Sequence, residues 1–178
     1  DEVTGIAMAL PGFVDNRTGY VSNGGALLYN TATPVGQLLA EKCGCPVILE
    51  NDGKAAAMAE LANGALKGCC NAAVFIIGTG VGGGIVVEGK LLHGAHGSGA
   101  EIGHLVLNRD ETVPCNCGKR GCVEQYCSAT GIVRLAKRHL DSTDAPSSLR
   151  TLKNLTCKDI FDAGKAGDKE ALIILDRY

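Results

Sequence analysis

The sequence contains four side chains whose types and spacing suit a metal ion. They follow the pattern H-x10-C-x-C-x4-C and are His104, Cys115, Cys117 and Cys122. Three thiolates and one imidazole are a common tetrahedral ligand set for zinc, and such a closed set leaves no position for a substrate. Gly118 and Gly121 favour a tight turn between the cysteines. We therefore predict a structural zinc knuckle; the alternative is three buried thiols and an unrelated histidine.

A candidate general base lies at the expected end of a buried strand. Residues 46–49 predict a short strand, and an alanine-rich helix is expected over 54–68, so Asn51 and Asp52 fall at the junction. Open α/β sheets bind ligands beyond the carboxyl ends of their strands. Asp52 is therefore the best candidate base, with Asn51 as a hydrogen-bonding neighbour. Helix capping is the alternative, because Asn and Asp are both favoured caps.

A glycine-rich segment separates two expected strands. Its residues are Gly78, Thr79, Gly80, Val81, Gly82, Gly83 and Gly84. It lacks the Gly-Lys-Ser/Thr of a Walker A loop, and no helix follows it as in a dinucleotide-binding unit. A glycine turn between strands can still offer backbone N–H groups to a phosphate. A plain flexible turn is the alternative, and a second hairpin turn is expected at Glu88-Gly89.

Two carboxylates are placed by the predicted metal site. Glu101 lies three residues before His104, so one helical turn would put both on one face. Glu124 follows Cys122 by two residues, so the knuckle would also fix its position. If zinc takes one imidazole nitrogen, the other can face a substrate hydroxyl or a neighbouring protein group that orients the ring. These side chains predict a polyol-binding wall; the alternative for the two carboxylates is an ordinary solvated charge.

The remaining pattern predicts alternating strands and helices, which is typical of an α/β fold. Residues 3–10 predict a buried strand and 13–32 a loop. A helix is expected from a Thr33 cap, with Pro34 at its first position, to Gly44. The helix over 54–68 would bury Ala55, Met58, Ala59, Ala62, Ala65 and Leu66. Further expectations are a strand over 72–77, a helix over 123–139, a loop over 141–151, and two helices after Thr156 and Asp168.

The composition excludes several classes of protein. The chain has 178 residues, a formal net charge of −2, 46% hydrophobic and 20% charged residues. These values exclude a disordered chain and argue against a broad nucleic-acid surface. No apolar run reaches the roughly 18 residues of a membrane span, and no signal peptide is visible at the N-terminus. With nine cysteines and no export signal, we expect reduced thiols and a cytoplasmic location.

Five segments in this order and spacing resemble the ROK family (repressor, open reading frame, kinase). They are ALPGFVD (9–15), PVILENDGKAAAMAE (46–60), GTGVGGGI (78–85), GAEIGH (99–104) and CNCGKRGCVEQYCS (115–128). The resemblance implies an actin-like ATPase fold of two RNase H-like lobes, here partial and with an inserted zinc knuckle. Residues 1–66 would form an incomplete first lobe, and 67–178 a second lobe that is truncated at its C-terminal end.

The resemblance also implies an activity, the ATP-dependent phosphorylation of a hexose or amino-sugar, as in the glucokinases of carbohydrate metabolism and glycolysis. By position, Asp52 matches the catalytic base. The residues that match the family's sugar-binding positions are Gly12, Asn51, Asp52, Glu101, His104 and Glu124. The residues that match the family's loop for the ATP phosphates, which Mg²⁺ would bridge, are Gly78, Thr79, Gly80, Val81, Gly82, Gly83, Gly84 and Ile85. The residues that match the family's structural zinc ligands are His104, Cys115, Cys117 and Cys122. A homodimer or homotetramer is expected.

The chain departs from the family pattern at both ends. It lacks the Asp-x-Gly-Gly-Thr phosphate loop and the segment that holds the adenosine, so we expect an internal fragment with negligible kinase activity by itself. One alternative is the sugar-sensing domain of a ROK-type transcriptional repressor, although no DNA-binding element is expected in this segment. The other is a zinc-stabilised interaction module without catalysis. Asp52 and the intact glycine loop favour the kinase, since a sensor needs neither.

Overall fold

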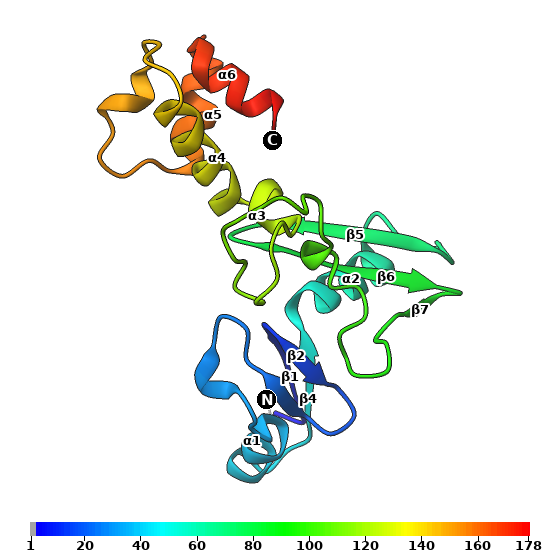
Figure 1. Cartoon of the computed structure of the whole chain (residues 1–178). Coiled ribbons are helices and arrows are strands. Elements are labelled where there is room, and N and C mark those ends of the chain that lie inside the picture. The colour runs from blue at the N-terminus through cyan, green and yellow to red at the C-terminus, as the bar shows by residue number, and fades with distance from the viewer. Residues whose placement is uncertain (1–2) are drawn as a thin grey trace. The chain divides into compact units, whose positions relative to one another are not determined.

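The computed structural model describes residues 3–178 and shows a mixed α/β fold (Figure 1). Two compact units are formed by Asp1–Ile76 with Gly82–Glu101, and by Ile77–Val81 with Ile102–Tyr178. Asp1 and Glu2, at the terminus where no signal peptide is expected, lie outside the described residues. Within residues 3–178, no helix combines the length and apolar character needed to cross a membrane. The predicted division into lobes after residue 66 stays a prediction.

The first unit contains two of the expected strands, and they pair in parallel. β1 (Ile6–Leu10) pairs with β4 (Val47–Asn51), and α1 (Val35–Cys43) lies between them in the chain. Leu10 of β1 and Leu49 of β4 form a small core with Val14 and Val21. The loop expected over 13–32 is wrong, because it contains the hairpin of β2 (Phe13–Asp15) and β3 (Tyr20–Asn23) and the short helix η1 (Leu28–Asn30). Strands this short give almost no alternating pattern.

The cap of α1 differs from the prediction by one residue. Pro34 occupies the N-cap position, and Thr33 instead forms a bridge with Val21, whose N–H donates to the Thr33 carbonyl at 2.9 Å. Thr33 is therefore part of the sheet edge and not of the helix. The predicted end is confirmed, because Gly44 closes the helix in the left-handed conformation with φ of 65°.

The helix α2 (Asp52–Asn63) starts directly at the end of β4 and ends earlier than predicted. The predicted apolar stripe is wrong, because Met58, Ala59 and Ala62 are exposed while Gly53, Lys54 and Ala57 are buried. An alanine-rich helix has little contrast between its faces, so periodicity alone cannot orient it. The buried side is chosen by close packing: a Cβ added at Gly84 would lie 2.4 Å from the Cβ of Ala57.

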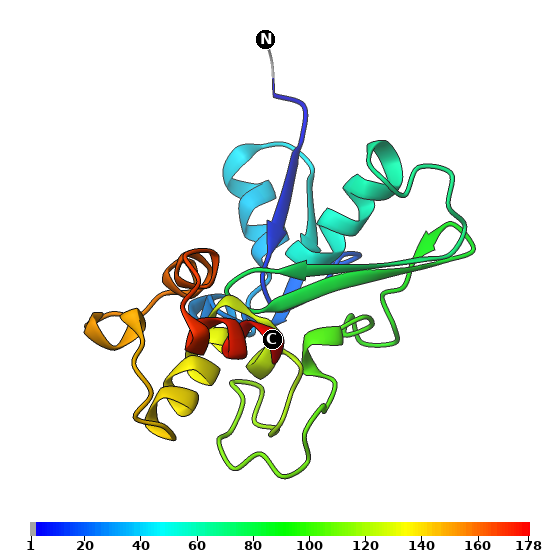
Figure 2. The same ribbon diagram turned by 90° about the horizontal axis from the view of Figure 1, so that it is seen from above.

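The strands β5 (Ala72–Ile77), β6 (Val81–Val87) and β7 (Lys90–Leu91) form a sheet in this order. Figure 2 shows β5 and β6 as a long pair of neighbouring strands. The predicted second turn is confirmed, with φ of 51° at Glu88 and 73° at Gly89. Gly82–Gly84, expected in the glycine loop, belong to β6, so the turn itself is only Gly78–Gly80.

The second unit begins its helices later and in more pieces than predicted. The single helix expected over 123–139 is wrong: α3 (Glu124–Cys127) and α4 (Ala129–Asp141) are separated by Ser128. Ser128 is extended, with φ of −112° and ψ of 167°, and its hydroxyl accepts a hydrogen bond from Gly131 N at 2.9 Å. A serine that caps a new helix interrupts the old one, because its side chain replaces the missing backbone acceptor.

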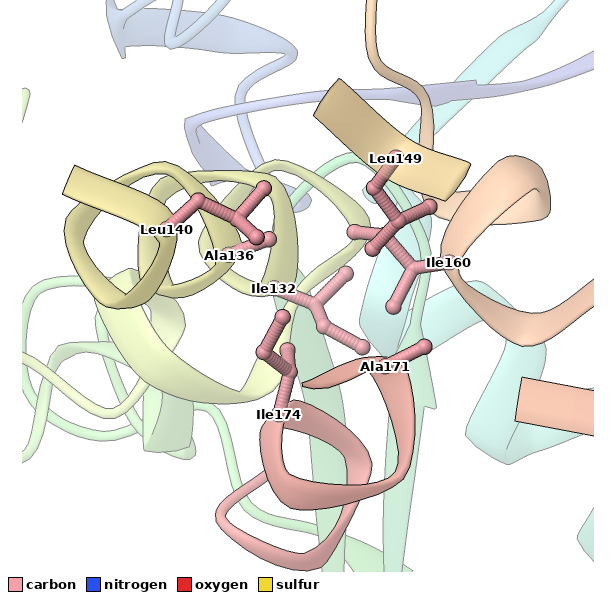
Figure 3. Close-up of a cluster of buried hydrophobic side chains, with 7 residues drawn as sticks. All are labelled: Ile132, Ala136, Leu140, Leu149, Ile160, Ala171 and Ile174. Carbon is pink, nitrogen blue, oxygen red and sulfur yellow. The ribbon is translucent and has the colours of Figure 1, made fainter. Parts of the chain in front are cut away.

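The end of the chain forms a small helical core. The expected caps Thr156 and Asp168 begin α5 (Cys157–Lys165) and α6 (Lys169–Asp176), which confirms both helices. The segment expected as a loop contains the short helix η3 (Ser148–Thr151), whose Leu149 is buried. Figure 3 shows the apolar side chains of these elements and α4 pointing toward one another; they are Ile132, Ala136, Leu140, Leu149, Ile160, Ala171 and Ile174.

Candidate functional site

The junction between β4 and α2 separates the two predicted roles of Asn51 and Asp52. Asn51 is the N-cap, and its Oδ1 accepts a hydrogen bond from Lys54 N at 3.1 Å. Its Nδ2 donates to the carbonyl of Gly12 at 3.0 Å. Asp52 is exposed in the first helical turn, and its Oδ1 accepts a hydrogen bond from the neighbouring Gly53 N at 2.8 Å. Capping therefore belongs to Asn51, which leaves the Asp52 carboxylate facing solvent and available for chemistry.

Gly12 adopts a backbone conformation that suits glycine. Its φ is 91°, and an added Cβ would lie 2.1 Å from the carbonyl oxygen of Asn23. No other residue type fits there without moving the neighbouring backbone. Because the Gly12 carbonyl accepts from Asn51, this turn also fixes the orientation of the Asn51 amide.

Two buried charged residues flank this pair, and the sequence analysis did not predict a role for either. Glu50 is 9% exposed and accepts hydrogen bonds from Asn51 N at 2.9 Å and from His93 Nε2 at 2.7 Å. Lys54 is 1% exposed, and its Nζ donates to the carbonyl of Gly97. The sequence did contain a signal for both, because Glu50 lies at the end of an apolar strand and Lys54 lies in an alanine-rich helix. A charged residue in such surroundings is buried only when it has a partner.

The glycine turn is held by the start of α4. The carbonyls of Gly78 and Thr79 accept hydrogen bonds from Ala129 N at 2.9 Å and from Thr130 Oγ1 at 2.8 Å. Thr79 itself is exposed. Gly78 N donates to the carbonyl of Gly80 at 2.9 Å, so the amides of Thr79 and Gly80 are the groups of the turn that an anion could meet.

Glu124, predicted as a sugar ligand, lies against this turn. Its Oε2 accepts a hydrogen bond from Val81 N at 3.0 Å, and a Cβ added at Gly80 would lie 2.1 Å from the same oxygen. One amide that was predicted to bind phosphate is thus engaged by a carboxylate. The contact places a carboxylate oxygen directly beside the turn, at the first residue of β6.

The four predicted metal ligands come together in the second unit. Their ligand atoms all lie within 4.8 Å of one another, one each from His104, Cys115, Cys117 and Cys122. Cys115 Sγ is 3.8 Å from His104 Nδ1, and Cys117 Sγ is 3.7 Å from Cys122 Sγ. Zinc–sulfur bonds of about 2.3 Å in a tetrahedron separate two sulfurs by roughly 3.8 Å, so donor types and spacing both fit zinc.

The backbone around these ligands is tightly folded. Gln125 Oε1 accepts from Gly121 N at 2.8 Å and from Cys122 N at 3.1 Å, which ties α3 to the cysteine loop. Burial, together with hydrogen bonds to the neighbouring cysteines, raises the pKa of the Cys122 thiol to about 12. A bound cation would reverse this preference, because metal ligation requires the thiolate.

A buried carboxylate beside the cysteine loop was also missed. Glu111 accepts hydrogen bonds from both terminal nitrogens of Arg138, at 2.8 and 2.7 Å, and from Tyr126 Oη at 2.7 Å. The Arg138 guanidinium holds the pKa of Glu111 well below its ordinary value of 4.5, although burial opposes this shift. Because Tyr126 belongs to α3, the network joins α3 and α4 to the loop that carries the cysteines.

The structure thus places the predicted residues in two described groups. In the first unit, Gly12, Asn51 and Asp52 adjoin one another, and Glu101 directly precedes the short helix η2 (Ile102–His104) in the chain. In the second unit, the metal-ligand set, Glu124 and the glycine turn adjoin one another. Gly83 and Gly84 pack against α2 within the first unit. The catalytic, sugar-binding and phosphate-binding roles stay predictions.

Comparison with known proteins gives one consistent family. The model of the ROK family matches residues 1–178. A glucokinase from Halalkalibacterium halodurans is 39% identical over 178 residues, which cover 98% of this chain and 54% of the relative. The chain therefore spans about half the length of the curated relatives it matches.

Two solved structures resemble the fold. One is a ROK family glucokinase from Streptomyces griseus in complex with glucose and AMPPNP, with a TM-score of 0.80 and 32% identity over 97% of this chain and 57% of that one. The other is a ROK family transcriptional regulator, a homologue of the E. coli Mlc protein, with a TM-score of 0.84 and 32% identity over 98% of this chain and 43% of that one. The similar proteins therefore include both an enzyme and a regulator.

Proposed function

Because the chain belongs to the ROK family, we propose that the full-length gene product containing these 178 residues is an ATP-dependent sugar kinase. Its fold would be of the actin-like ATPase type, and its substrate a hexose or an amino-sugar. The glucokinase relatives, at 39% and 35% identity, support a sugar as the acceptor. The reaction would transfer the terminal phosphoryl group of ATP to a sugar hydroxyl.

The observation that carries this proposal is that the Asp52 carboxylate is exposed and does not cap the helix. Its carboxylate is exposed at the end of a parallel strand, and the adjacent Asn51 performs the capping. A carboxylate that the fold does not use can accept the proton of an attacking hydroxyl, which is the one step of proton transfer that phosphoryl transfer requires. Asp52 would be the general base.

The sugar would be held by hydrogen bonds to its hydroxyls. Gly12, Asn51, Glu101, His104 and Glu124 are the proposed ligands. His104 presents Nδ1 to the sulfur of Cys115, which leaves Nε2 as the nitrogen for a hydroxyl. Holding several hydroxyls at once fixes the acceptor in attack geometry, and this orientation supplies much of the rate enhancement.

The phosphate groups would be met by the backbone of Gly78, Thr79 and Gly80, with the following residues through Ile85 forming the strand that supports this turn. Mg²⁺, when bound with ATP, would neutralise the phosphate charge. Val81 N, directly after the turn, donates to a carboxylate oxygen of Glu124, which supports an anion-compatible backbone at this end of β6. The residues of this chain thus orient the donor while Asp52 receives the proton.

Zinc is the proposed metal for His104, Cys115, Cys117 and Cys122. The donor set and the distances of 3.7 and 3.8 Å fit a tetrahedral site with no open position, so its role would be structural. The metal would orient the His104 ring and hold the short helix that carries Glu124. Zinc would therefore act on sugar binding through these two side chains.

A sugar-sensing regulator is the second candidate. It is favoured by the likeness to the ROK family transcriptional regulator. A sensor needs the sugar-binding residues but neither a base nor a phosphate loop. The two candidates therefore differ at Asp52 and at Gly78–Gly80, where this chain keeps the features of the kinase.

One assay separates the candidates. The full-length gene product is incubated with ATP, Mg²⁺ and each member of a panel of hexoses and N-acetylhexosamines, and ADP formation is followed. The kinase proposal predicts ADP formation that depends on one or a few sugars. Binding of a sugar by calorimetry without any sugar-dependent ADP formation would overturn the kinase and support the sensor.

A further inference from the structure

Two buried charges of opposite sign enclose the Asn51–Asp52 pair in sequence. Glu50 precedes the pair, and Lys54 follows it within the first turns of α2. They are 9% and 1% exposed. Neither residue has a role in the reaction proposed above. Each has one side-chain contact with the same segment, residues 93–99, which we call the anchored loop.

The two carboxylate oxygens of Glu50 have different partners. Oε1 accepts from the backbone N–H of Asn51 at 2.9 Å, so it fixes the peptide that leads into Asp52. Oε2 accepts from His93 Nε2 at 2.7 Å and from Asn16 Nδ2 at 3.3 Å. A carboxylate only accepts, so His93 must carry its proton on Nε2. One side chain therefore holds both the catalytic junction and the start of the anchored loop.

Lys54 holds the other part of the loop. Its Nζ donates to the carbonyl of Gly97, while its backbone N–H donates to Asn51 Oδ1 at 3.1 Å. Gly97 lies close to β2 as well, because an added Cβ would be 2.9 Å from the carbonyl oxygen of Val14. This lysine is therefore connected to Asn51 by its backbone and to the anchored loop by its side chain.

The anchored loop is compact, so the contacts at His93 and Gly97 hold the loop as a single unit. Gly99 N donates to the carbonyl of His93 at 2.8 Å, which closes the loop at its base. Gly94, with φ of 73°, lies against Gly99, where an added Cβ would be 3.0 Å from the Gly99 nitrogen. Only Ala100 separates this closed loop from Glu101, the proposed sugar ligand of the same unit.

We propose that Glu50, His93 and Lys54 are positioning residues that hold the anchored loop, and with it Glu101, in register with Asp52. The inference rests on the proposed function. Replacing buried charges by apolar groups is often neutral for stability, so two buried charges directed at one loop point to a requirement for position. Loss of either contact lets the loop shift, and the sugar then loses the alignment between its ligand and the base.

The test is steady-state kinetics of the full-length gene product with its preferred sugar, comparing Glu50→Gln, His93→Gln and Lys54→Met. Matched controls are Glu41→Gln and Lys42→Met on the exposed face of α1, and His96→Gln, an exposed histidine in the same loop. The three positioning variants should raise the sugar KM by about tenfold or more and leave the ATP KM within about twofold, whereas the controls should change neither. The double variant Glu50→Gln/His93→Gln should cost less than the sum of the two single variants, since both alter the contact between Glu50 and His93.

The outcomes distinguish this inference from the proposed function. A wild type that phosphorylates a sugar, with positioning variants that match their controls in sugar KM, overturns the inference alone. An inactive wild type overturns the kinase, and hydrogen exchange then decides the inference. His93→Gln must speed amide exchange in residues 94–99 and at 51–54 relative to His96→Gln, and equal exchange overturns it. His93 is half-buried, so this variant keeps the test valid if Glu50→Gln does not fold.

Discussion

Replacing Glu111 by glutamine tests how the cysteine loop is held to the helices. The carboxylate side chain is 2% exposed and takes four hydrogen bonds. Oε2 accepts from Arg138 Nη1 at 2.8 Å and Tyr126 Oη at 2.7 Å. Oε1 accepts from Arg138 Nη2 at 2.7 Å and Val113 N at 2.9 Å. Glutamine keeps one acceptor oxygen, and its NH₂ group must then face two donors.

The magnitude follows from these contacts. Two bonds to a charged group are lost at about 1.5–3 kcal/mol each, or roughly 3–6 kcal/mol as an upper range. The Arg138 side chain is 44% exposed and regains water, which reduces the loss. We expect the free energy of unfolding to fall by about 3 kcal/mol, or about 6–12 °C in the unfolding midpoint of the 178-residue chain.

The pH dependence has a definite sign. The pKa of Glu111 is lowered in the folded protein, so its stabilisation is complete above the ordinary value of 4.5 and is lost as pH falls through the folded pKa. Thermal unfolding followed by circular dichroism from pH 7 to pH 3 should therefore show the wild type losing part of its advantage over Glu111→Gln below pH 4.5. Asp110→Asn, an exposed neighbour, is the control. A Glu111→Gln protein as stable as Asp110→Asn at pH 7 would refute the reasoning.

Two further predictions concern the metal and the glycine strand. Removing the metal with a chelator should increase hydrogen exchange over residues 104–124 and weaken sugar binding together, because His104 and Glu124 lose their supports; unchanged sugar affinity in a metal-free, folded sample would contradict this coupling. Gly84→Ala should lower the unfolding midpoint by about 5 °C, since its Cβ would lie 2.4 Å from that of Ala57. Gly82→Ala is the control, because its Cβ meets the nearest atom at an ordinary 3.8 Å; equal midpoints for the two variants would show that α2 does not require this approach.

The sequence predicts an element well where the signal is local. Thr156 and Asp168 cap their helices as expected, and Gly44 ends α1, because a cap is decided by a few neighbouring residues. The strand over 72–77 was predicted with its observed bounds, since a run of β-branched and aromatic residues lies between turns. The ligand spacing of the cysteine loop likewise identified the group that the structure brings together.

Prediction fails where tertiary contacts decide. Lys54 lies in an alanine-rich helix, and nothing in the periodicity indicates that a lysine and not Met58 faces inward. The partner that makes its burial possible is a carbonyl 43 residues away in the chain. Ser128 was expected within a helix because its cap role depends on the turn that precedes it. Glu50 and Glu111 were missed for the same reason, since their partners are distant in sequence.

The central claim is that Asp52 is the general base of a sugar kinase. The most direct measurement is the kcat of the full-length gene product with its preferred sugar, for the wild type and for Asp52→Asn. The account predicts that kcat falls by about 10²–10⁴-fold in the variant, while sugar binding by calorimetry is retained. An Asp52→Asn protein that transfers phosphate to the sugar at the wild-type rate would contradict it.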